Sequence, residues 1–213
     1  MSSVAVIDYG MGNLHSIAKA LQHADSGAKV HITAEAKTIQ SADRVVFPGV
    51  GAIRDCMHAL HELNLIDPIK QAALTKPFLG VCLGMQALLT DSEENGGTLC
   101  LNLFPGHVRR FADDLRDAQG QMLKVPHMGW NRVKQRPHPL WRDIQQDSRF
   151  YFVHSYFVTP DRDADSIATS DYPNPFTCAL ARDNVFAVQF HPEKSQTVGL
   201  QLLQNFLRWD GAA

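Results

Sequence analysis

Strand-like and helix-like patterns alternate through the first half of the chain, and this alternation limits the folds that it can adopt. Four short apolar runs are typical of buried strands: Val4–Asp8, Val30–Thr33, Arg44–Phe47 and Pro77–Cys82. Apolar residues recur at helical spacing in three further segments: Leu14–Leu21, Ile53–Leu60 and Leu83–Leu89. Because crossovers join strands that are separated by helices, the pattern predicts a mostly parallel sheet with helices on both faces.

The second half is richer in strand-like runs and predicts an additional small, mostly antiparallel portion. These runs are His107–Phe111, Leu123–Val125, Phe150–Val153, Thr177–Ala181 and Val185–Phe190. The polar segment Ala112–Gln121 is predicted to be a surface loop, and the chain closes on a helical pattern between Leu200 and Leu207. No repeat or linker divides the chain, so we predict one α/β domain over residues 1–213.

Composition excludes several classes of partner. With 45% apolar and 20% charged residues the chain has the make-up of a globular protein, and a net charge of −2 gives no general nucleic-acid footprint. A signal-like N-terminus and an apolar run of the ~18 residues that a membrane span needs are both lacking, so we expect no membrane contact and a cytoplasmic location. The four cysteines lack Cys-x-x-Cys and zinc-site spacing, and we expect them to be free thiols.

Cys82 lies in the pattern Gly80-Val81-Cys82-Leu83-Gly84, where a predicted strand meets a predicted helix. Flanking glycines allow a sharp turn that exposes the side chain at the carboxyl end of the strand, as in a nucleophile elbow. The unpaired N–H groups at the helix start favour a thiolate and can stabilise an oxyanion. A buried cysteine whose glycine neighbours only permit close packing fits this pattern about equally well.

A candidate base follows near the C-terminus, in His191-Pro192-Glu193. A residue before proline favours an extended backbone, in which side chains two residues apart point to the same side. Glu193 can then orient the His191 ring and stabilise its charged form, as the third member of a nucleophilic triad does. Most isolated His-Pro-Glu strings are merely solvated strand ends, so this motif gains weight only beside the Cys82 motif.

Together, Gly80-Val81-Cys82-Leu83-Gly84-Met85-Gln86 and His191-Pro192-Glu193 resemble the two motifs of the class I, or triad, glutamine amidotransferases. The resemblance implies a flavodoxin-like α/β fold, a Cys82–His191–Glu193 triad that hydrolyses L-glutamine to glutamate and ammonia, and no cofactor or metal. It also implies an oxyanion hole at Val50, Gly51 and Leu83. The glutamine-binding residues that it implies are Gly49, Gln86, Glu94, Ser155 and Tyr156.

Three further motifs are similar to those of one branch of the family, the glutaminase subunits of imidazole glycerol phosphate synthases. They are Asp8-Tyr9-Gly10-Met11-Gly12-Asn13, Pro48-Gly49-Val50-Gly51 and His127-Met128-Gly129-Trp130-Asn131. That branch acts in histidine biosynthesis, and the similarity implies a heterodimer with a (βα)-barrel cyclase subunit that uses the ammonia. The residues implied at the partner interface are Asn13, Trp130, Asn131, Tyr151 and Lys194.

Other hypotheses fit the sequence less well. Gly10-Met11-Gly12 follows a strand, but His15 replaces the third glycine of a dinucleotide-binding fingerprint. His58 and His61 have no evident third metal ligand. The functional alternatives are the glutaminase subunit of another synthase, such as anthranilate synthase, and a γ-glutamyl hydrolase or cysteine peptidase on a related fold. A catalytically dead scaffold is disfavoured by the intact triad residues.

Overall fold

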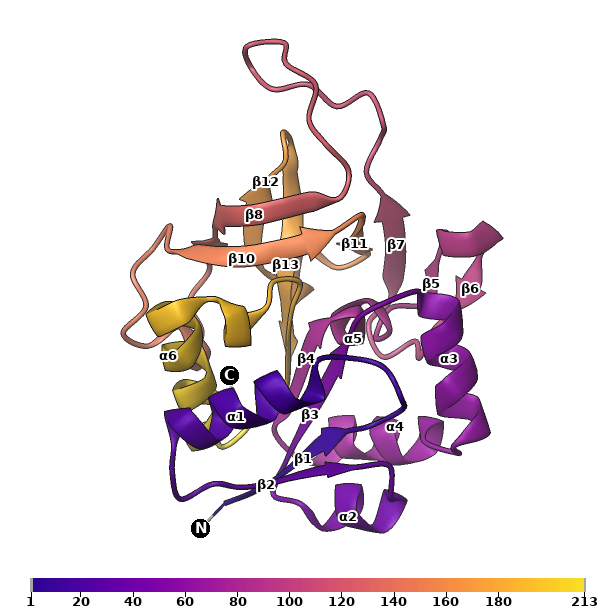
Figure 1. Cartoon of the computed structure of the whole chain (residues 1–213), viewed down its shortest axis with the longest axis vertical. Helices are drawn as coiled ribbons and strands as arrows, with labels where there is room; N and C mark the ends of the chain where they lie inside the picture. Colours follow the sequence, from indigo (N-terminus) through magenta and orange to yellow (C-terminus); the bar gives the residue numbers. More distant parts are fainter. Residues whose placement is uncertain (1, 213) are drawn as a thin grey trace.

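Within residues 2–212, twelve strands form one mixed sheet, and a separate pair of strands forms a second sheet. The computed structural model describes residues 2–212 (Figure 1). The helices are α1 (Leu14–Ala24), α2 (Ala36–Ser41), α3 (Ile53–Glu62), α4 (Ile66–Thr75), α5 (Leu83–Gln86) and α6 (Gln196–Arg208). The strands are β1 (Ser3–Ile7), β2 (Lys29–Thr33), β3 (Arg44–Gly49), β4 (Phe78–Cys82), β5 (Asp91–Ser92), β6 (Thr98–Leu99), β7 (Gly106–Arg110), β8 (His127–Arg132), β9 (Lys134–Gln135), β10 (Arg149–His154), β11 (Tyr156–Pro160), β12 (Ser166–Asp171), β13 (Pro175–Arg182) and β14 (Val185–Val188).

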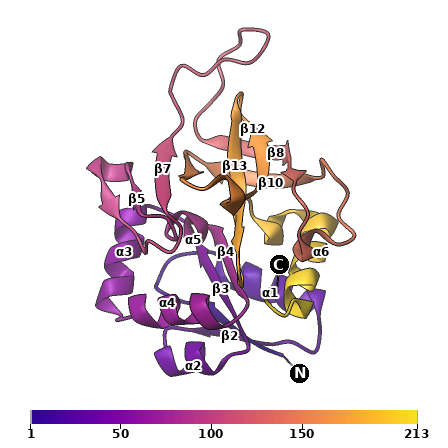
Figure 2. The same ribbon diagram turned by 180° about the vertical axis from the view of Figure 1, so that it is seen from behind.

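The parallel part of the sheet has the order β2-β1-β3-β4-β14 and is covered by helices on both faces. Side chains alternate along β1, so Val4 and Val6 enter one core, and Ala5 and Ile7 enter the other. The first core contains the apolar sides of α1 and α6, and the second contains those of α2, α3 and α4 (Figures 1 and 2). The predicted parallel sheet with two helical layers is thereby confirmed.

Antiparallel strands extend the sheet beyond β14, as the second half of the sequence predicts. Strand β13 pairs with β14, β12 and β11, and β11 continues the sheet to β7. The two-stranded sheet pairs β8 with β10 in antiparallel register, with Trp130 opposite Tyr151. This sheet lies above the carboxyl ends of the parallel strands in Figure 1.

Two expected elements differ from the structure. Residues 123–125, expected as a strand, belong instead to an irregular excursion, in which the Leu123 N–H donates to the Leu115 carbonyl. Pro126 has no N–H for a strand ladder, so the strand starts at His127, which the periodicity did not predict. The helix expected over 83–89 ends at Gln86, because carbonyls of residues 87–89 accept hydrogen bonds from residues 101–104.

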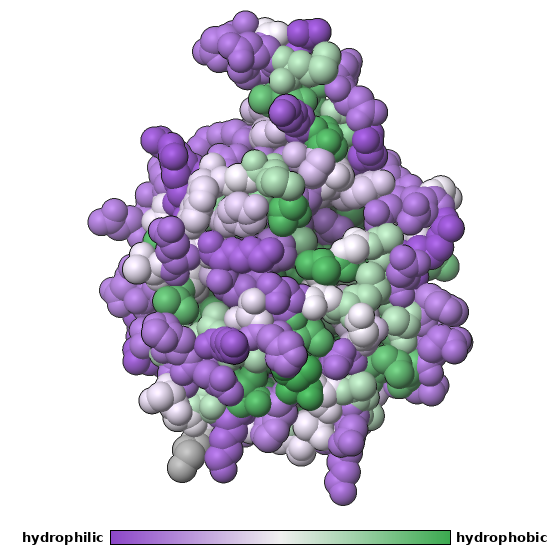
Figure 3. All heavy atoms as spheres, viewed as in Figure 1, coloured by the Kyte–Doolittle hydropathy of each residue, from purple (hydrophilic) through white to green (hydrophobic). Residues whose placement is uncertain are grey.

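The segment Ala112–Gln121 is a surface loop, as predicted. It contains no regular helix or strand apart from one isolated bridge between Arg116 and Met122. The loop projects from the molecule at the top of Figures 1 and 2, and Figure 3 shows hydrophilic and hydrophobic side chains mixed on it.

Candidate active site

Cys82 occupies a strained turn at the end of β4. Its φ of 54° and ψ of −110° lie where residues other than glycine are rare, and α5 starts at the next residue. The turn needs glycine at position 84, because a Cβ there would collide with the backbone carbonyl of Phe47. The Leu83 N–H has no intrahelical acceptor because it opens the helix, so it is free to face a developing negative charge.

His191 and Glu193 form a buried pair beside this turn. His191 Nδ1 lies 2.8 Å from Glu193 Oε1, and the two side chains are only 3% and 4% exposed. The backbone is extended at His191 as predicted, but Glu193 lies in a 3₁₀ turn (Pro192–Lys194) rather than in a strand. Ser195 fixes the turn, since its hydroxyl donates to the His191 carbonyl (2.6 Å) and accepts from the Tyr151 N–H (3.0 Å).

The surroundings of His191 favour its charged form. Burial lowers the pKa of the imidazole, but interactions with Cys82 and Glu193 outweigh burial and raise that pKa to about 10. Among the described residues, no group makes a hydrogen bond of normal geometry to His191 Nε2. His191 Nε2 is therefore available to a substrate atom in the cavity that His191 lines.

A cavity of about 400 Å³ opens at the sulfur. Its lining brings together Cys82, His191 and seven of the residues predicted for the oxyanion hole and for glutamine. Its full lining is Val50, Gly51, Cys82, Leu83, Gln86, Glu94, Pro126, Val153, His154, Ser155, Tyr156 and His191. The sequence analysis assigned no role in the site to Pro126, Val153 or His154, which reach the cavity through the packing of β10 and of the segment before β8.

Two predicted residues, Gly49 and Glu193, lie behind the cavity rather than in its wall. Both line a much smaller void together with Asn13 and His191. A side chain at position 49 would collide with the Tyr9 hydroxyl, which donates to the Pro48 carbonyl at 3.1 Å. Gly49 thus lets the end of β3 approach Cys82 and Leu83 closely.

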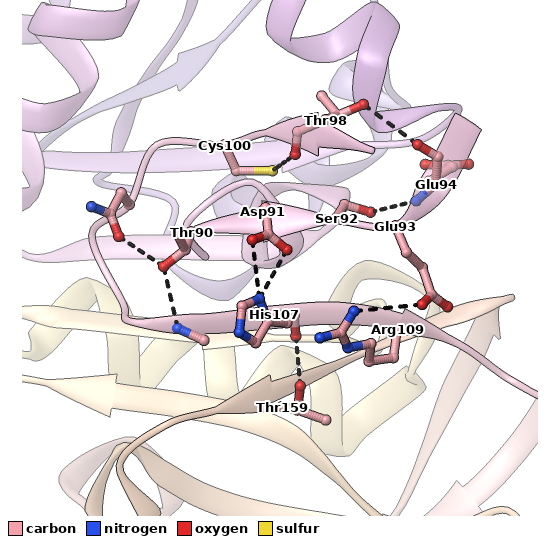
Figure 4. A network of polar contacts seen from close by, with 12 residues as sticks. Thr90, Asp91, Ser92, Glu93, Glu94, Thr98, Cys100, His107, Arg109 and Thr159 are labelled. Carbon is pink, nitrogen blue, oxygen red and sulfur yellow. Dashed lines mark hydrogen bonds and ion pairs between the residues drawn. The ribbon is translucent and has the colours of Figure 1, made fainter. Parts of the chain in front are cut away.

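Glu94 reaches the cavity from a compact polar segment between β5 and β6 (Figure 4). Its Oε2 accepts the Ile53 N–H at 2.8 Å and so satisfies the first turn of α3. The Glu94 N–H donates to Ser92 Oγ at 3.2 Å, and the Glu94 carbonyl accepts from the Thr98 hydroxyl at 3.5 Å. Glu94 is therefore held in place, which the acidic run 91–94 alone does not indicate.

The residues predicted for a partner interface divide into two groups. Trp130 is 43% exposed, and its ring meets that of Tyr151 edge to face at 6.1 Å. Lys194 Nζ lies 5.9 Å from the Tyr151 ring centre, so these three share one surface. Asn131 and Asn13 differ from them, because the Asn131 amide donates inward to the Asp171 carbonyl at 2.8 Å and Asn13 lines the small void.

A family model described as "Glutamine amidotransferase class-I" matches residues 5–209. The chain is 64% identical over 212 residues to the "Imidazole glycerol phosphate synthase subunit HisH" of Methylococcus capsulatus, covering 99% of this chain and 98% of the relative. The protein of the same name from Nitrosococcus oceani is 58% identical, and all of both chains is covered. The chain belongs to the class-I glutamine amidotransferases, in the HisH family.

Solved structures of more distant proteins share the fold of this HisH-family chain. The PurLQS structure from Thermotoga maritima matches with a TM-score of 0.68 at 15% identity, over 98% of this chain and 99% of that one. The glutaminase domain of the CTPS from Trypanosoma brucei matches with a TM-score of 0.61 at 16% identity, over 99% and 95%. At these identities the likeness concerns the fold alone.

Two other features of this HisH-family chain bear on its site. Within residues 2–212, no three His, Cys, Asp or Glu side chains are grouped as a metal site would require. No helix in this range is both long and apolar enough to span a membrane.

Proposed function

We propose that the chain is the glutaminase subunit of an imidazole glycerol phosphate synthase and acts as one amidotransferase domain over residues 1–213. The observation that carries the proposal is the buried His191–Glu193 pair at the strained turn of Cys82, all three at or directly behind one cavity. The near full-length similarity to HisH subunits supports the choice of synthase. The ammonia serves histidine biosynthesis through a partner cyclase.

The reaction starts when Cys82 attacks the side-chain amide carbon of glutamine as a thiolate. Negative charge moves to the amide oxygen, where the Leu83 N–H and the backbone of Val50 and Gly51 stabilise it. The imidazolium of His191 protonates the amide nitrogen, and the C–N bond breaks to release ammonia. A thioester remains on Cys82. His191 then removes a proton from water, which attacks the thioester, releases glutamate and restores the thiolate and the imidazolium.

The cavity is suited to the head group of glutamine. The Glu94 carboxylate lines its wall and supplies negative charge for the α-ammonium group. Gln86 donates both hydrogens of its side-chain nitrogen to protein acceptors, so its carbonyl oxygen is what it offers to a ligand. Ser155 and Tyr156 close the same wall, while Gly49 supports the oxyanion loop from behind.

The cyclase binds the face formed by Trp130, Tyr151 and Lys194, with Asn13 and Asn131 at or just beneath its edge. This face adjoins the cavity, because Tyr151 and the cavity-lining Val153 are neighbours on the same side of β10. An exposed tryptophan packed on a tyrosine with a polar rim is typical of interface hot spots. Ammonia released at Cys82 then passes to the cyclase inside the complex.

The test is glutamate release from free glutamine, measured for the wild type and for Cys82→Ala. Each protein is assayed alone and with the cyclase subunit plus the nucleotide substrate of the cyclase. We expect the wild-type rate of glutamate release to rise when the cyclase and its nucleotide substrate are added. In Cys82→Ala the rate should be lower by at least ~10⁴-fold. Full activity of Cys82→Ala would refute the triad. Wild-type hydrolysis that is indifferent to the cyclase would refute the choice of synthase and leave the triad standing.

A further inference from the structure

Gln189 is fully buried between β14 and His191, and the proposed reaction leaves it without a role. Its side-chain nitrogen lies 3.6 Å from Cys82 Sγ, within hydrogen-bond range for sulfur. Its side-chain oxygen accepts from Gln86 Nε2 at 3.0 Å. One amide group therefore contacts both the nucleophile and a residue that lines the cavity.

The direction of these hydrogen bonds is fixed by the surrounding groups. The Tyr156 carbonyl can only accept, and it lies 3.2 Å from Gln86 Nε2, so that atom of Gln86 must be the nitrogen. The second hydrogen of this nitrogen then needs an acceptor, which within residues 2–212 is the oxygen of Gln189. The nitrogen of Gln189 is consequently the atom that faces Cys82, and it donates to the sulfur.

A buried histidine pair holds the same carbonyl. His154 Nδ1 donates to the Tyr156 carbonyl at 2.7 Å, and His154 Nε2 accepts from His127 Nδ1 at 2.8 Å. The Tyr156 carbonyl thus receives two donors and cannot turn without breaking both bonds. Gln86 is hydrogen-bonded to this carbonyl and Gln189 to Gln86, so both side chains are held in place. Turning either of them would leave a buried donor or acceptor unpaired, which is costly.

We propose that Gln189 is a positioning residue of the glutaminase, with one function at each end of its amide. The N–H end holds the Cys82 sulfur in its attacking position and stabilises its negative charge. The oxygen end keeps Gln86 turned so that its carbonyl oxygen faces the cavity and accepts from a substrate N–H. Gln189 is not among the residues that line the cavity, so it acts through its neighbours and does not touch the substrate. This inference rests on the proposed function, since it concerns the same reaction.

Two substitutions of Gln189 separate the effects of the N–H end and the oxygen end of its side-chain amide. Gln189→Glu keeps the length and an acceptor for Gln86, and in its ionised form, which assays at alkaline pH favour, it has no hydrogen to donate to sulfur. Gln189→Met keeps the approximate shape and removes both contacts. Cys178→Ala is the matched control for damage to the core, because Cys178 is fully buried and its carbonyl, which survives the change, accepts the Gln189 backbone N–H at 2.9 Å.

The variants are compared in complex with the cyclase by kcat and KM for glutamine. Independently of turnover, the rate of Cys82 alkylation by iodoacetamide at fixed pH is followed by mass spectrometry of the Cys82 peptide. For Gln189→Glu we expect kcat and the alkylation rate to fall by roughly 10- to 100-fold, as for loss of a hydrogen bond to a charged group, with KM within about twofold of wild type. Gln189→Met should show the same falls and, in addition, a KM raised by about tenfold.

The proposal is overturned if Gln189→Glu keeps kcat and the alkylation rate within about twofold of wild type. It is also overturned if kcat and the alkylation rate of both Gln189 variants fall only in proportion to a lowered melting temperature, as is expected for Cys178→Ala. Failure of the proposed function gives a different result. In that case the wild type does not hydrolyse glutamine, while the alkylation rates still report whether Gln189 acts on Cys82.

Discussion

Glu94 serves two parts of the molecule with one carboxylate. One oxygen satisfies the first N–H of α3, and the residue also lines the wall of the cavity. Helix α3 starts directly after the loop that contains Val50 and Gly51. A ligand that attracts Glu94 therefore acts on a group that is tied, through Ile53, to the loop proposed to hold the oxyanion.

We expect Glu94→Gln to raise KM for glutamine by roughly 10- to 100-fold, because the charge that faces the α-ammonium group is lost. The amide oxygen can still accept the Ile53 N–H, so the melting temperature should change little. Glu94→Ala should raise KM as well and should also lose about 1 kcal/mol of unfolding free energy, since the helix start is left unsatisfied. Steady-state kinetics and chemical denaturation of both variants provide the measurements. An unchanged KM in Glu94→Gln would remove Glu94 from the binding site.

Buried histidines make stability depend on pH: the partly buried His138, with a pKa lowered by burial to about 4, acts in the same direction as the buried pair His127 and His154. Burial lowers the pKa of His127 to about 4 and, as the largest of several effects, lowers that of His154 to about 3. In the unfolded chain both rings titrate near ~6.5. As pH falls below ~6.5 the unfolded state binds protons that the folded state excludes, so unfolding becomes more favourable.

We expect the unfolding free energy to fall between pH ~6.5 and pH 4, by up to roughly 1.4 kcal/mol per pH unit for each ring. The measurement is denaturation at a series of pH values for the wild type, His127→Gln and His58→Gln. His127→Gln should flatten the slope, whereas the exposed His58→Gln should leave it unchanged. Equal slopes in all three proteins would show that His127 and His154 do not control the pH dependence of the unfolding free energy between pH ~6.5 and pH 4.

At the scale of elements, the four-residue helix α5 is packed against the end of β3. Gly49 of β3 lies in register with Cys82 of β4, and Gly84 contacts the Phe47 carbonyl so closely that a Cβ cannot fit. The approach places the proposed oxyanion loop, Val50 and Gly51 after β3, next to the first N–H groups of α5. The geometry of the nucleophile turn is therefore set by two adjacent parallel strands as well as by its own residues.

Gly84→Ala should lose about 1–3 kcal/mol of unfolding free energy, because the new methyl group meets backbone that cannot move aside. Its glutaminase activity should fall further than the loss of folded protein explains, since the turn at Cys82 is displaced. Gly27→Ala is the control, because its Cβ would meet only the flexible Asp25 side chain, at 3.2 Å. Denaturation midpoints and activity per folded molecule distinguish the two variants, and equal stability in both would contradict the packing argument.

At the scale of the whole molecule, the two-stranded sheet β8–β10 has two different faces. Its inner face buries His127, Phe150, Phe152 and His154, while its outer face exposes Met128 and Trp130. The inner face reaches the cavity through the His127–His154–Tyr156 hydrogen bonds. The sheet thus connects the proposed partner surface with the residues around Cys82.

Trp130→Ala should weaken binding of the cyclase by at least about 30-fold, the effect of losing one hot-spot side chain of ~2 kcal/mol. The melting temperature of the free chain should change little, because the indole is 43% exposed. Titration calorimetry with the cyclase provides the affinity. Leu74→Ala, which changes another exposed side chain, on helix α4, is the control and should bind as the wild type does. Equal affinities of the two variants would place the interface elsewhere.

Features that depend on neighbouring residues could be predicted from the amino-acid sequence. Apolar periodicity predicted the alternating elements and the two-layered parallel core, because strand and helix periods are local properties of the chain. The glycines around Cys82 predicted its sharp turn, and the spacing of His191 and Glu193 predicted their pairing across one intervening residue. The structure confirmed the turn and the pairing, although Glu193 reaches His191 from a 3₁₀ turn rather than from an extended strand.

The distant side chains that complete the site became known from the folded structure and not from the sequence. Gln189 meets Cys82 across 107 positions and Gln86 across 103, because β14 pairs with β4 in a register that places Val188 beside Val81. His154 reaches the cavity because β10 folds over the carboxyl ends of the parallel strands. Periodicity acts over a few residues and specifies which face a side chain occupies, whereas the partner of a buried polar group depends on strand order and register, which no local pattern encodes.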